Sequence, residues 1–411
     1  MAEAYIVAAV RTAGGRRGGR LSGWHPADLA AHVVDALLEH TNADPALVED
    51  VIMGCVLQAG EQSGCIGRMA VLASKLPKAV PGVTIDRQCG SSQQALHFAA
   101  QAVMSGTMDC VIAAGVESMS RIPMAALSKI YKDAGLGHYM SPTIRERYPG
   151  PEFSQFMGAE MMAEKYQLSR DALDWYSLHS HQRAAAATLD GGFAAEIVPV
   201  AVRVIDHSGG PAPTGTHDDG SNDDLGMHVA DEGIRKDATL EGIRGVKLLR
   251  EGGRITAASA SQICDGASGV LVVNDRGLKA MGARPLARIH HMTVIGGDPV
   301  IMLEAPLPAT HHALKKAGLT VDDIDLFEVN EAFASVPVAW LQDTGADPAR
   351  LNVNGGAIAL GHPLGASGTR LMTTLVHSLQ ARSKRYGLQT MCEGGGQANV
   401  TIVERLRAGS G

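Results

Sequence analysis

Short apolar runs that end in Gly or Asn alternate with Ala-rich stretches of helical periodicity at both ends of the chain. This alternation favours parallel strands covered by helices on both faces, so an α/β fold is predicted. The N-terminal segments expected to be regular are the strands Tyr5–Val10, Asp50–Val56, Val83–Ile85 and Asp109–Gly115, and the helices Pro26–His40 and about Ser91–Met104.

The C-terminal third repeats this order of elements, which indicates two related halves. Each half is expected to contribute a parallel sheet, and polar groups at the carboxyl ends of the strands would then converge. The alternative is a coincidence of generic βα patterning. The corresponding segments are Asp322–Val329 with Glu49–Val56, the strand before Asn354 and the helix after Ser367 with the strand and helix around Cys89, and Tyr386–Cys392 with Asp109–Gly115.

Residues from about 120 to 255 have a different pattern and are predicted to be an inserted domain or lid. Helices are expected at Met157–Tyr166 and Ala172–Thr188, and the polar stretch Asp206–Gly226 is expected to be a surface excursion. A basic run follows, which is either a solvated helix face or a phosphate-binding surface. It consists of Arg235, Lys236, Arg244, Lys247, Arg250 and Arg254.

Composition and charge narrow the class of protein. A length of 411 residues predicts two to three domains. The net charge of −7 disfavours nucleic-acid binding and attraction to anionic membranes. Six cysteines without a CxxC motif predict free thiols in a reducing compartment, and no signal peptide or membrane span is recognisable, so we expect a cytoplasmic protein.

Cys89 is the first candidate for chemistry. It lies in DRQCGSSQQALHF, where a β-like run ends and a helix begins. Backbone N–H groups and the helix dipole at such a position favour a thiolate, which predicts a nucleophile. The alternative is a buried structural cysteine, the interpretation we give to Cys55 and Cys110 inside apolar strands.

His362 stands on a glycine-rich turn, in NVNGGAIALGHPLGASG, before a helix that starts near Ser367. Glycines permit close approach of a ligand, and Pro363 restricts the turn, so His362 is a candidate base as well as a candidate structural histidine. No Gly-Lys-Ser/Thr follows, so this is not a Walker loop.

Two further polar groups are expected at strand ends. Cys392 opens CEGGGQ, where a thiol meets exposed backbone amides, and Asn330 in VNEAFA could hold a water or a carbonyl, or simply cap a helix. The repeat would bring both to Cys89 and His362. The Cys and His spacings match no usual zinc pattern, so no metal site is expected.

These motifs resemble the thiolase family of acetyl-CoA acyltransferases, from YIVAAVRTAGGRRGG to TIVERL, and are most similar to actinobacterial degradative members that include steroid-catabolic enzymes. The resemblance implies the thiolase fold: two similar βαβαβαββ halves forming a layered α/β core, with an inserted loop domain, in a homodimer or homotetramer. The expected N-terminal half is residues 1–120 plus 256–276. The CoA-binding loop domain is 121–255 and the C-terminal half is 277–411.

The resemblance also implies roles for residues. Cys89 would be the acyl-accepting nucleophile, His362 its base and Cys392 a second acid and base, while Asn330 would fix a water and the N–H groups of Cys89 and Gly394 would hold an oxyanion. Coenzyme A enters as a substrate, with no permanently bound cofactor. The implied contacts are Ser261 and Arg235 for CoA, and Met157 and Phe333 for the acyl pocket.

The chain departs from the family pattern at four positions: Gln262 and Cys264 in the pantetheine segment, Phe156 before Met157, and Glu304. The last two point away from a dedicated acetoacetyl-CoA synthase. The expected activity is therefore degradative thiolysis of 3-ketoacyl-CoA, in fatty-acid or steroid catabolism. Two alternatives remain, a biosynthetic acetyl-CoA C-acetyltransferase and a catalytically silent acyl-CoA or lipid-binding protein.

Overall fold

The computed structural model describes residues 3–124, 126–203 and 225–406. Most of its strands belong to one large sheet in the order β11-β12-β13-β10-β1-β9-β5-β3-β4, to which β2 and β6 add short edges. The strands of the N-terminal half are β1 (Tyr5–Thr12), β2 (Gly15–Arg16), β3 (Asp50–Gly54), β4 (Gly82–Ile85), β5 (Cys110–Ser118) and β9 (Cys264–Val273). Those of the C-terminal half are β10 (Ala287–Gly296), β11 (Leu326–Val329), β12 (Tyr386–Glu393) and β13 (Gln397–Glu404).

The pairing of these strands confirms the internal repeat. β3 is parallel to β5, β5 is antiparallel to β9 and β9 is antiparallel to β1. In the same order, β11 is parallel to β12, β12 is antiparallel to β13 and β13 is antiparallel to β10. The halves meet where β1 pairs with β10, at Tyr5↔Arg288.

The prediction of a parallel sheet in each half was wrong, because each half is mixed. The reason is clearest at β12 and β13, which are joined by the three residues between Glu393 and Gln397. A connection this short can only return the chain antiparallel, since a parallel pairing needs a crossover of a dozen or more residues.

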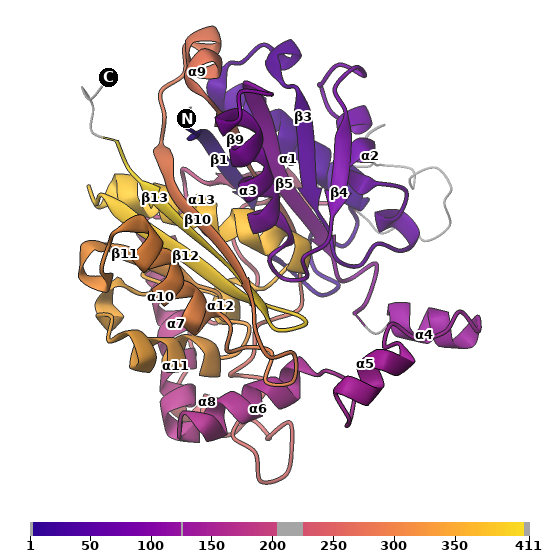
Figure 1. The fold of residues 1–411 in the computed structure, drawn as a ribbon, viewed down its shortest axis with the longest axis vertical. Helices are drawn as coiled ribbons and strands as arrows, with labels where there is room; N and C mark the ends of the chain where they lie inside the picture. The colour runs from indigo at the N-terminus through magenta and orange to yellow at the C-terminus, as the bar shows by residue number, and fades with distance from the viewer. Residues whose placement is uncertain (1–2, 125, 204–224, 407–411) are drawn as a thin grey trace.

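Helices cover both outer faces and fill the space between the halves (Figure 1). α1 and α2 pack on one face of the N-terminal strands, and α10 and α11 pack on the outer face of the C-terminal strands. α3 and α13 share a central apolar cluster with strands of both halves. The bounds are α1 (Pro26–Thr41), α2 (Ile66–Ala73), α3 (Ser91–Met104), α9 (Asp275–Met281), α10 (Pro306–Ala317), α11 (Ser335–Thr344), α12 (Ala357–Leu360) and α13 (Ser367–Ala381).

One predicted element is almost absent. The strand expected before Asn354 is reduced to isolated bridges, of which Leu351 makes one with Phe327. Asn352 and Gly355 have φ angles of 44° and 77°, so the chain turns away directly after the bridge. An extended strand cannot continue through residues in the left-handed region.

The segment between the halves forms helices outside the sheet and a small hairpin of β7 (Val200–Ala201) and β8 (Met227–His228). Figure 1 shows α4 and α5 projecting from the body of the molecule. Nearly all of the predicted polar excursion, Asp206–Gly226, lies outside the described residues. The helices are α4 (Ala126–Asp133), α5 (Pro142–Arg147), α6 (Gln155–Lys165), α7 (Arg170–Leu189) and α8 (Leu240–Arg244), while β6 (Ile197–Val198) joins β1.

Within the described part of the chain, no helix is long and apolar enough to cross a membrane. All six cysteines are free, as predicted.

Candidate active site

Cys89 lies in the turn between β4 and α3, and this turn packs directly on the end of β12. Gln88 has a φ of 49°, an unusual backbone conformation for a residue with a side chain. A Cβ built on Gly394 would lie 2.8 Å from Gln88 Oε1, and one built on Gly90 would lie 1.9 Å from Glu393 Oε1. The two segments, about 300 residues apart in sequence, are therefore in contact on both sides of Cys89.

The Cys89 thiol is buried, and burial together with the charge of Glu393 raises its pKa to about 12. The backbone N–H groups of Cys89 and Gly394 hydrogen-bond the sulfur and oppose this shift. These two N–H groups therefore stabilise negative charge on the Cys89 sulfur.

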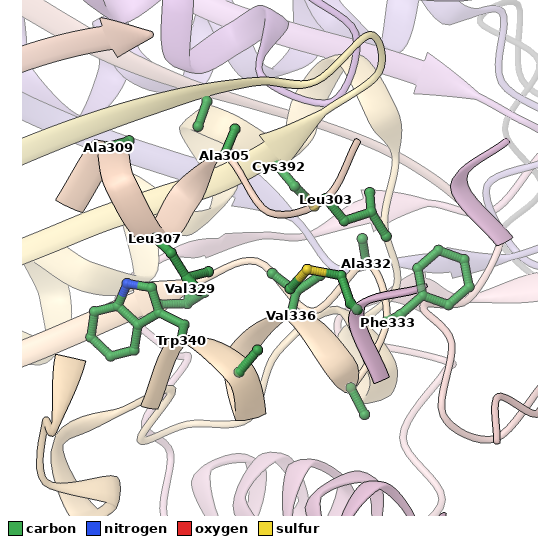
Figure 2. Packing of buried hydrophobic residues seen from close by; sticks show 14 of the residues in the cluster. Leu303, Ala305, Leu307, Ala309, Val329, Ala332, Phe333, Val336, Trp340 and Cys392 are labelled. Atoms are coloured by element: carbon green, nitrogen blue, oxygen red, sulfur yellow. The ribbon is translucent and has the colours of Figure 1, made fainter. Parts of the chain in front are cut away.

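Cys392 is the penultimate residue of β12 and lies in the apolar cluster on the outer side of the C-terminal half. Figure 2 shows it beside Leu303, in the same cluster as Ala332 and Phe333. Burial raises the pKa of the Cys392 thiol, and the charge of Cys89 raises it further. The charge of Cys89 therefore reaches Cys392, so the two thiols are electrostatically coupled, and a thiolate at Cys89 disfavours a second one at Cys392.

His362 is oriented by hydrogen bonds to both ring nitrogens. The Ser367 hydroxyl donates to the carbonyl of Pro363 at 2.8 Å, so its oxygen accepts from His362 Nδ1–H at 2.5 Å. The unprotonated ring nitrogen is then Nε2, whose lone pair accepts a long hydrogen bond of 3.4 Å from Asn330 Nδ2. This tautomer leaves Nε2 as the basic atom of the ring.

Burial lowers the pKa of His362 to about 3, with a smaller contribution from the Arg370 cation. The imidazole is therefore neutral near pH 7, and the raised pKa of Cys89 keeps the thiol neutral as well. The resting site therefore holds a neutral thiol and a neutral imidazole. Transfer of the Cys89 proton to His362 becomes favourable only when both resulting charges are stabilised, as when the sulfur attacks an electrophile.

The His362 segment is held in place by carboxylates from both halves. Glu117, at the end of β5, accepts from Gly365 N–H at 2.8 Å and from Val56 N–H at 3.0 Å. Glu331 accepts from Ile358 N–H at 3.0 Å and from Ser180 at 2.7 Å. These bonds fix the backbone on both sides of His362 without contacting its ring.

Asn330 follows β11 and is 1% exposed. Its Oδ1 is buried and has no hydrogen-bond partner among the described residues, although its Nδ2 donates to His362. A buried amide oxygen in this position is suited to accept a hydrogen bond from a water or a substrate group.

The remaining predicted residues belong to the segments around Asn330, α6 and α7. Ser261 N–H donates to the Ala332 carbonyl at 2.9 Å, next to the Asn330 segment. Phe333 makes an edge contact with Phe156, the two ring centroids being 5.5 Å apart. Met157 is 38% exposed on α6, and exposed Arg235 lies beside α7, with its N–H bonded to His181.

Sequence reasoning missed Ser367, Glu117 and Glu393. Ser367 follows His362 by five residues, so a helix-start serine near a candidate base was an available signal. Glu393 is a charged residue at the end of an apolar strand, which is equally visible. Glu117 gave no local signal, because its partners come from distant segments. Among the described residues, no cluster of three His, Cys, Asp or Glu is arranged to hold a metal.

Two buried thiols and a neutral imidazole, with N–H groups bonded to one sulfur, are groups that acyl transfer through a cysteine thioester requires. The family model "Thiolase, N-terminal domain" matches residues 4–276, and "Thiolase, C-terminal domain" matches residues 283–405. This chain belongs to the thiolase family, whose members act on coenzyme A thioesters.

Characterised relatives match along the whole chain. It is 51% identical to the steroid 3-ketoacyl-CoA thiolase FadA6 of Mycobacterium tuberculosis, over 99% of this chain and 95% of the relative. It is 40% identical to the β-ketoadipyl-CoA thiolase of Escherichia coli, covering 99% and 100%. The crystal structure of human mitochondrial 3-ketoacyl-CoA thiolase superposes with a TM-score of 0.86 at 34% identity, covering 99% of both chains. These matches confirm the predicted fold and the acyltransferase class.

Proposed function

We propose that this enzyme is a degradative 3-ketoacyl-CoA thiolase that acts on a steroid-derived acyl chain. The observation that carries the proposal is the contact between the Cys89 turn and the end of β12, which puts two thiols into one electrostatic site. The steroid substrate class is taken from the relative that is 51% identical. Thiolysis with two cysteines needs such a site.

In the first half-reaction, Cys89 attacks the ketone carbon of the 3-ketoacyl-CoA and its proton passes to His362 Nε2. The N–H groups of Cys89 and Gly394 hold the oxyanion that forms on that carbon. The Cα–Cβ bond then breaks, leaving the acyl group on Cys89 and its electron pair in the enolate of acetyl-CoA. Cys392 gives its proton to the enolate carbon, which releases acetyl-CoA.

The enolate oxygen is the second place where negative charge develops. His362, now protonated at Nε2, and a water held by Asn330 Oδ1 would donate to this oxygen. An imidazolium at His362 is unfavourable because the ring is buried. The enolate anion stabilises it, so transfer of the Cys89 proton to His362 is coupled to cleavage of the carbon–carbon bond.

In the second half-reaction, the Cys392 thiolate takes the proton of a fresh CoA thiol. The CoA sulfur attacks the thioester carbon of acyl-Cys89, and the Cys89 thiolate that leaves is reprotonated by His362. The products are acetyl-CoA and an acyl-CoA two carbons shorter, and the kinetics are ping-pong.

The binding regions complete the proposal. Ser261 would contact the pantetheine and Arg235 the adenosine phosphates, while Met157 and Phe333 would line the acyl pocket. Phe156 is 48% exposed beside Met157, which offers apolar surface to a bulky acyl group at the mouth of the site. The proposed domains are the N-terminal half, 1–120 plus 256–276, the CoA-binding loop domain, 121–255, and the C-terminal half, 277–411. The proposed assembly is a homodimer or homotetramer in the cytoplasm.

Replacement of the nucleophile tests the mechanism. Cys89→Ala should form no acyl-enzyme with a 3-ketoacyl-CoA, whereas Cys392→Ala should become acylated slowly and turn over at least about a hundredfold more slowly than wild type. Intact-protein mass spectrometry measures the acyl adduct. Full labelling of Cys89→Ala would refute the assignment of the nucleophile, and normal turnover of Cys392→Ala would remove its acid and base role.

A panel of substrates separates the degradative enzyme from the alternatives. Thiolysis is followed as CoA-dependent loss of the enolate absorbance of acetoacetyl-CoA, a medium-chain 3-ketoacyl-CoA and a ring-bearing 3-ketoacyl-CoA. We expect the highest kcat/KM for the ring-bearing substrate. A preference for acetoacetyl-CoA would favour the biosynthetic enzyme, and no turnover of any substrate would favour the silent binder.

A further inference from the structure

Glu393 is a buried carboxyl beside the nucleophile for which the mechanism above has no use. It follows Cys392 on β12, and because side chains alternate along a strand, it faces the opposite side of the sheet. That side is the start of α3, where its Oε1 lies against the Cα of Gly90. Glu393 is 0% exposed.

This carboxyl has an unusual lack of partners. Neither oxygen makes a well-formed hydrogen bond with a described residue, and only the backbone N–H of Asn399 and the Arg87 cation act to favour its charge. Arg87 acts on it only through its charge: its Nη1 donates to Gln397 Oε1 at 2.7 Å, and it makes no hydrogen bond to Glu393. Other buried carboxyls near the site, such as Glu117, each accept several hydrogen bonds.

A charge at this position is therefore poorly stabilised. Burial raises the pKa of Glu393 to about 8, against a usual value near 4.5. The titratable and charged groups that face this region are Arg87 and Asp86 before α3, Cys89, and Cys392 on the same strand. When Glu393 is ionised, its charge raises the pKa of both thiols.

We propose that Glu393 is a positioning residue that works as an uncharged carboxyl: it packs the Cys89 turn onto β12, and loss of its proton suppresses formation of the Cys89 thiolate. The packing part follows from the contact with Gly90, where no larger residue fits. The electrostatic part follows from a carboxyl without donors in a buried site that it shares with two thiols. Its effect on turnover rests on the proposed function, but its effect on thiol reactivity does not.

Below about pH 8 the carboxyl is neutral, and the ionisation of Cys89 is opposed by burial and, more weakly, by the charge of Asp86. As the pH rises through this value, a carboxylate forms beside Cys89 and the thiolate becomes harder to form. The reactivity of Cys89 in the wild type should therefore rise less steeply with pH than that of an isolated thiol.

Glu393→Gln tests this directly, since the amide keeps the size of the side chain and cannot ionise. We expect the rate of Cys89 alkylation by iodoacetamide to match the wild type within twofold at about pH 6 and to be at least about fivefold higher at pH 9. Site-resolved mass spectrometry gives the rate, with exposed Cys65 as the internal reference. Glu328→Gln is the matched control, because Glu328 is a buried carboxyl of the same sheet that is not among the main causes of the pKa shift of either thiol.

The outcomes separate the possible roles. A pH profile of Cys89 alkylation that is unchanged in the variant would overturn the proposal. Slower alkylation at every pH would also overturn it, because that result indicates only a loss of packing. If the buried amide prevents folding, Glu393→Leu provides the same uncharged comparison and should give the same gain at pH 9. In thiolysis, the pH at which kcat/KM declines on the alkaline side should move upward in the variant. Absence of thiolysis in the wild type would refute the proposed function while leaving the alkylation result valid.

Discussion

The chemistry of His362 depends on which ring nitrogen carries the proton, and a single hydroxyl decides this. The Ser367 hydroxyl uses its single hydrogen to donate to the carbonyl of Pro363. Its oxygen can therefore only accept a hydrogen bond from His362 Nδ1–H. Nε2 is left as a base next to Asn330. The buried site keeps the ring neutral, which preserves this base at every pH above about 3.

Removal of that hydroxyl should release the ring. Ser367→Ala leaves Nδ1–H without its acceptor, so both tautomers and other ring orientations become accessible. We expect kcat/KM for thiolysis to fall about tenfold, a part of the 10²–10⁴ that a positioned base contributes. Steady-state kinetics measures the effect. Thr373→Val on the same helix is the control, because it removes a buried hydroxyl that donates to the carbonyl of Thr369. It should change kcat/KM less than about twofold. Equal losses of kcat/KM in the two variants would contradict a role of Ser367 in tautomer selection.

At the level of elements, the loop that carries His362 reaches the N-terminal half by close backbone packing. The carbonyl of Gly365 lies 2.1 Å from the position of a Cβ on Gly115 of β5 and 2.6 Å from that of a Cβ on Gly54 of β3. Glycine at these two strand positions therefore permits the loop to lie directly on the sheet, within reach of Glu117. Any side chain there must displace backbone rather than a flexible group.

Gly115→Ala should therefore be destabilising and should also disturb the site. We expect the free energy of unfolding to fall by about 1–3 kcal/mol, the usual cost of overpacking, together with a reduced kcat for thiolysis. Urea denaturation measures the first effect. Gly296→Ala is the control, because a Cβ at Gly296 in β10 meets nothing within 4 Å, and its effect should stay within about 0.5 kcal/mol. A Gly115→Ala protein as stable as the control would show that the loop can move away freely.

In the whole molecule, the inserted segment is tied to the core by a buried charge cluster. Arg11 of β1 donates to Glu196 at 2.6 Å and to Asp231 at 2.7 Å, and all three side chains are almost fully buried. Both carboxylates belong to residues 121–255. The contact ties this segment to the end of β1, where Arg11 also pairs with Ile197 of β6.

Arg11→Met should leave two buried carboxylates without their cation. We expect a loss of about 3–5 kcal/mol in the free energy of unfolding, as for other buried pairs from which one partner is removed. Arg16→Met removes a cation that is 70% exposed from its pair with Glu232, and this change should cost less than about 1 kcal/mol. Thermal and urea unfolding at neutral pH measures both, and similar losses would mean that burial does not govern the strength of the Arg11 contacts.

The sequence alone was sufficient for the α/β class, the internal repeat and the bounds of regular elements such as α3, which begins and ends at the predicted residues. It also singled out Cys89, Asn330 and Cys392 as candidates, because each stands near the end of an apolar strand, and His362, because it lies on a glycine-rich turn before a helix. These features are local, since apolar periodicity and turn chemistry are encoded within a few residues.

Contacts between distant segments needed the folded chain. The antiparallel strands β9 and β13, the reduced strand at Leu351, and the pinning of the His362 loop by Glu117 all depend on which surfaces meet in space. The state of Glu393 is of the same kind, because its pKa follows from burial against Gly90 rather than from its neighbours in sequence. Residue type and spacing therefore specify which chemical groups are present, whereas packing sets their protonation and their partners.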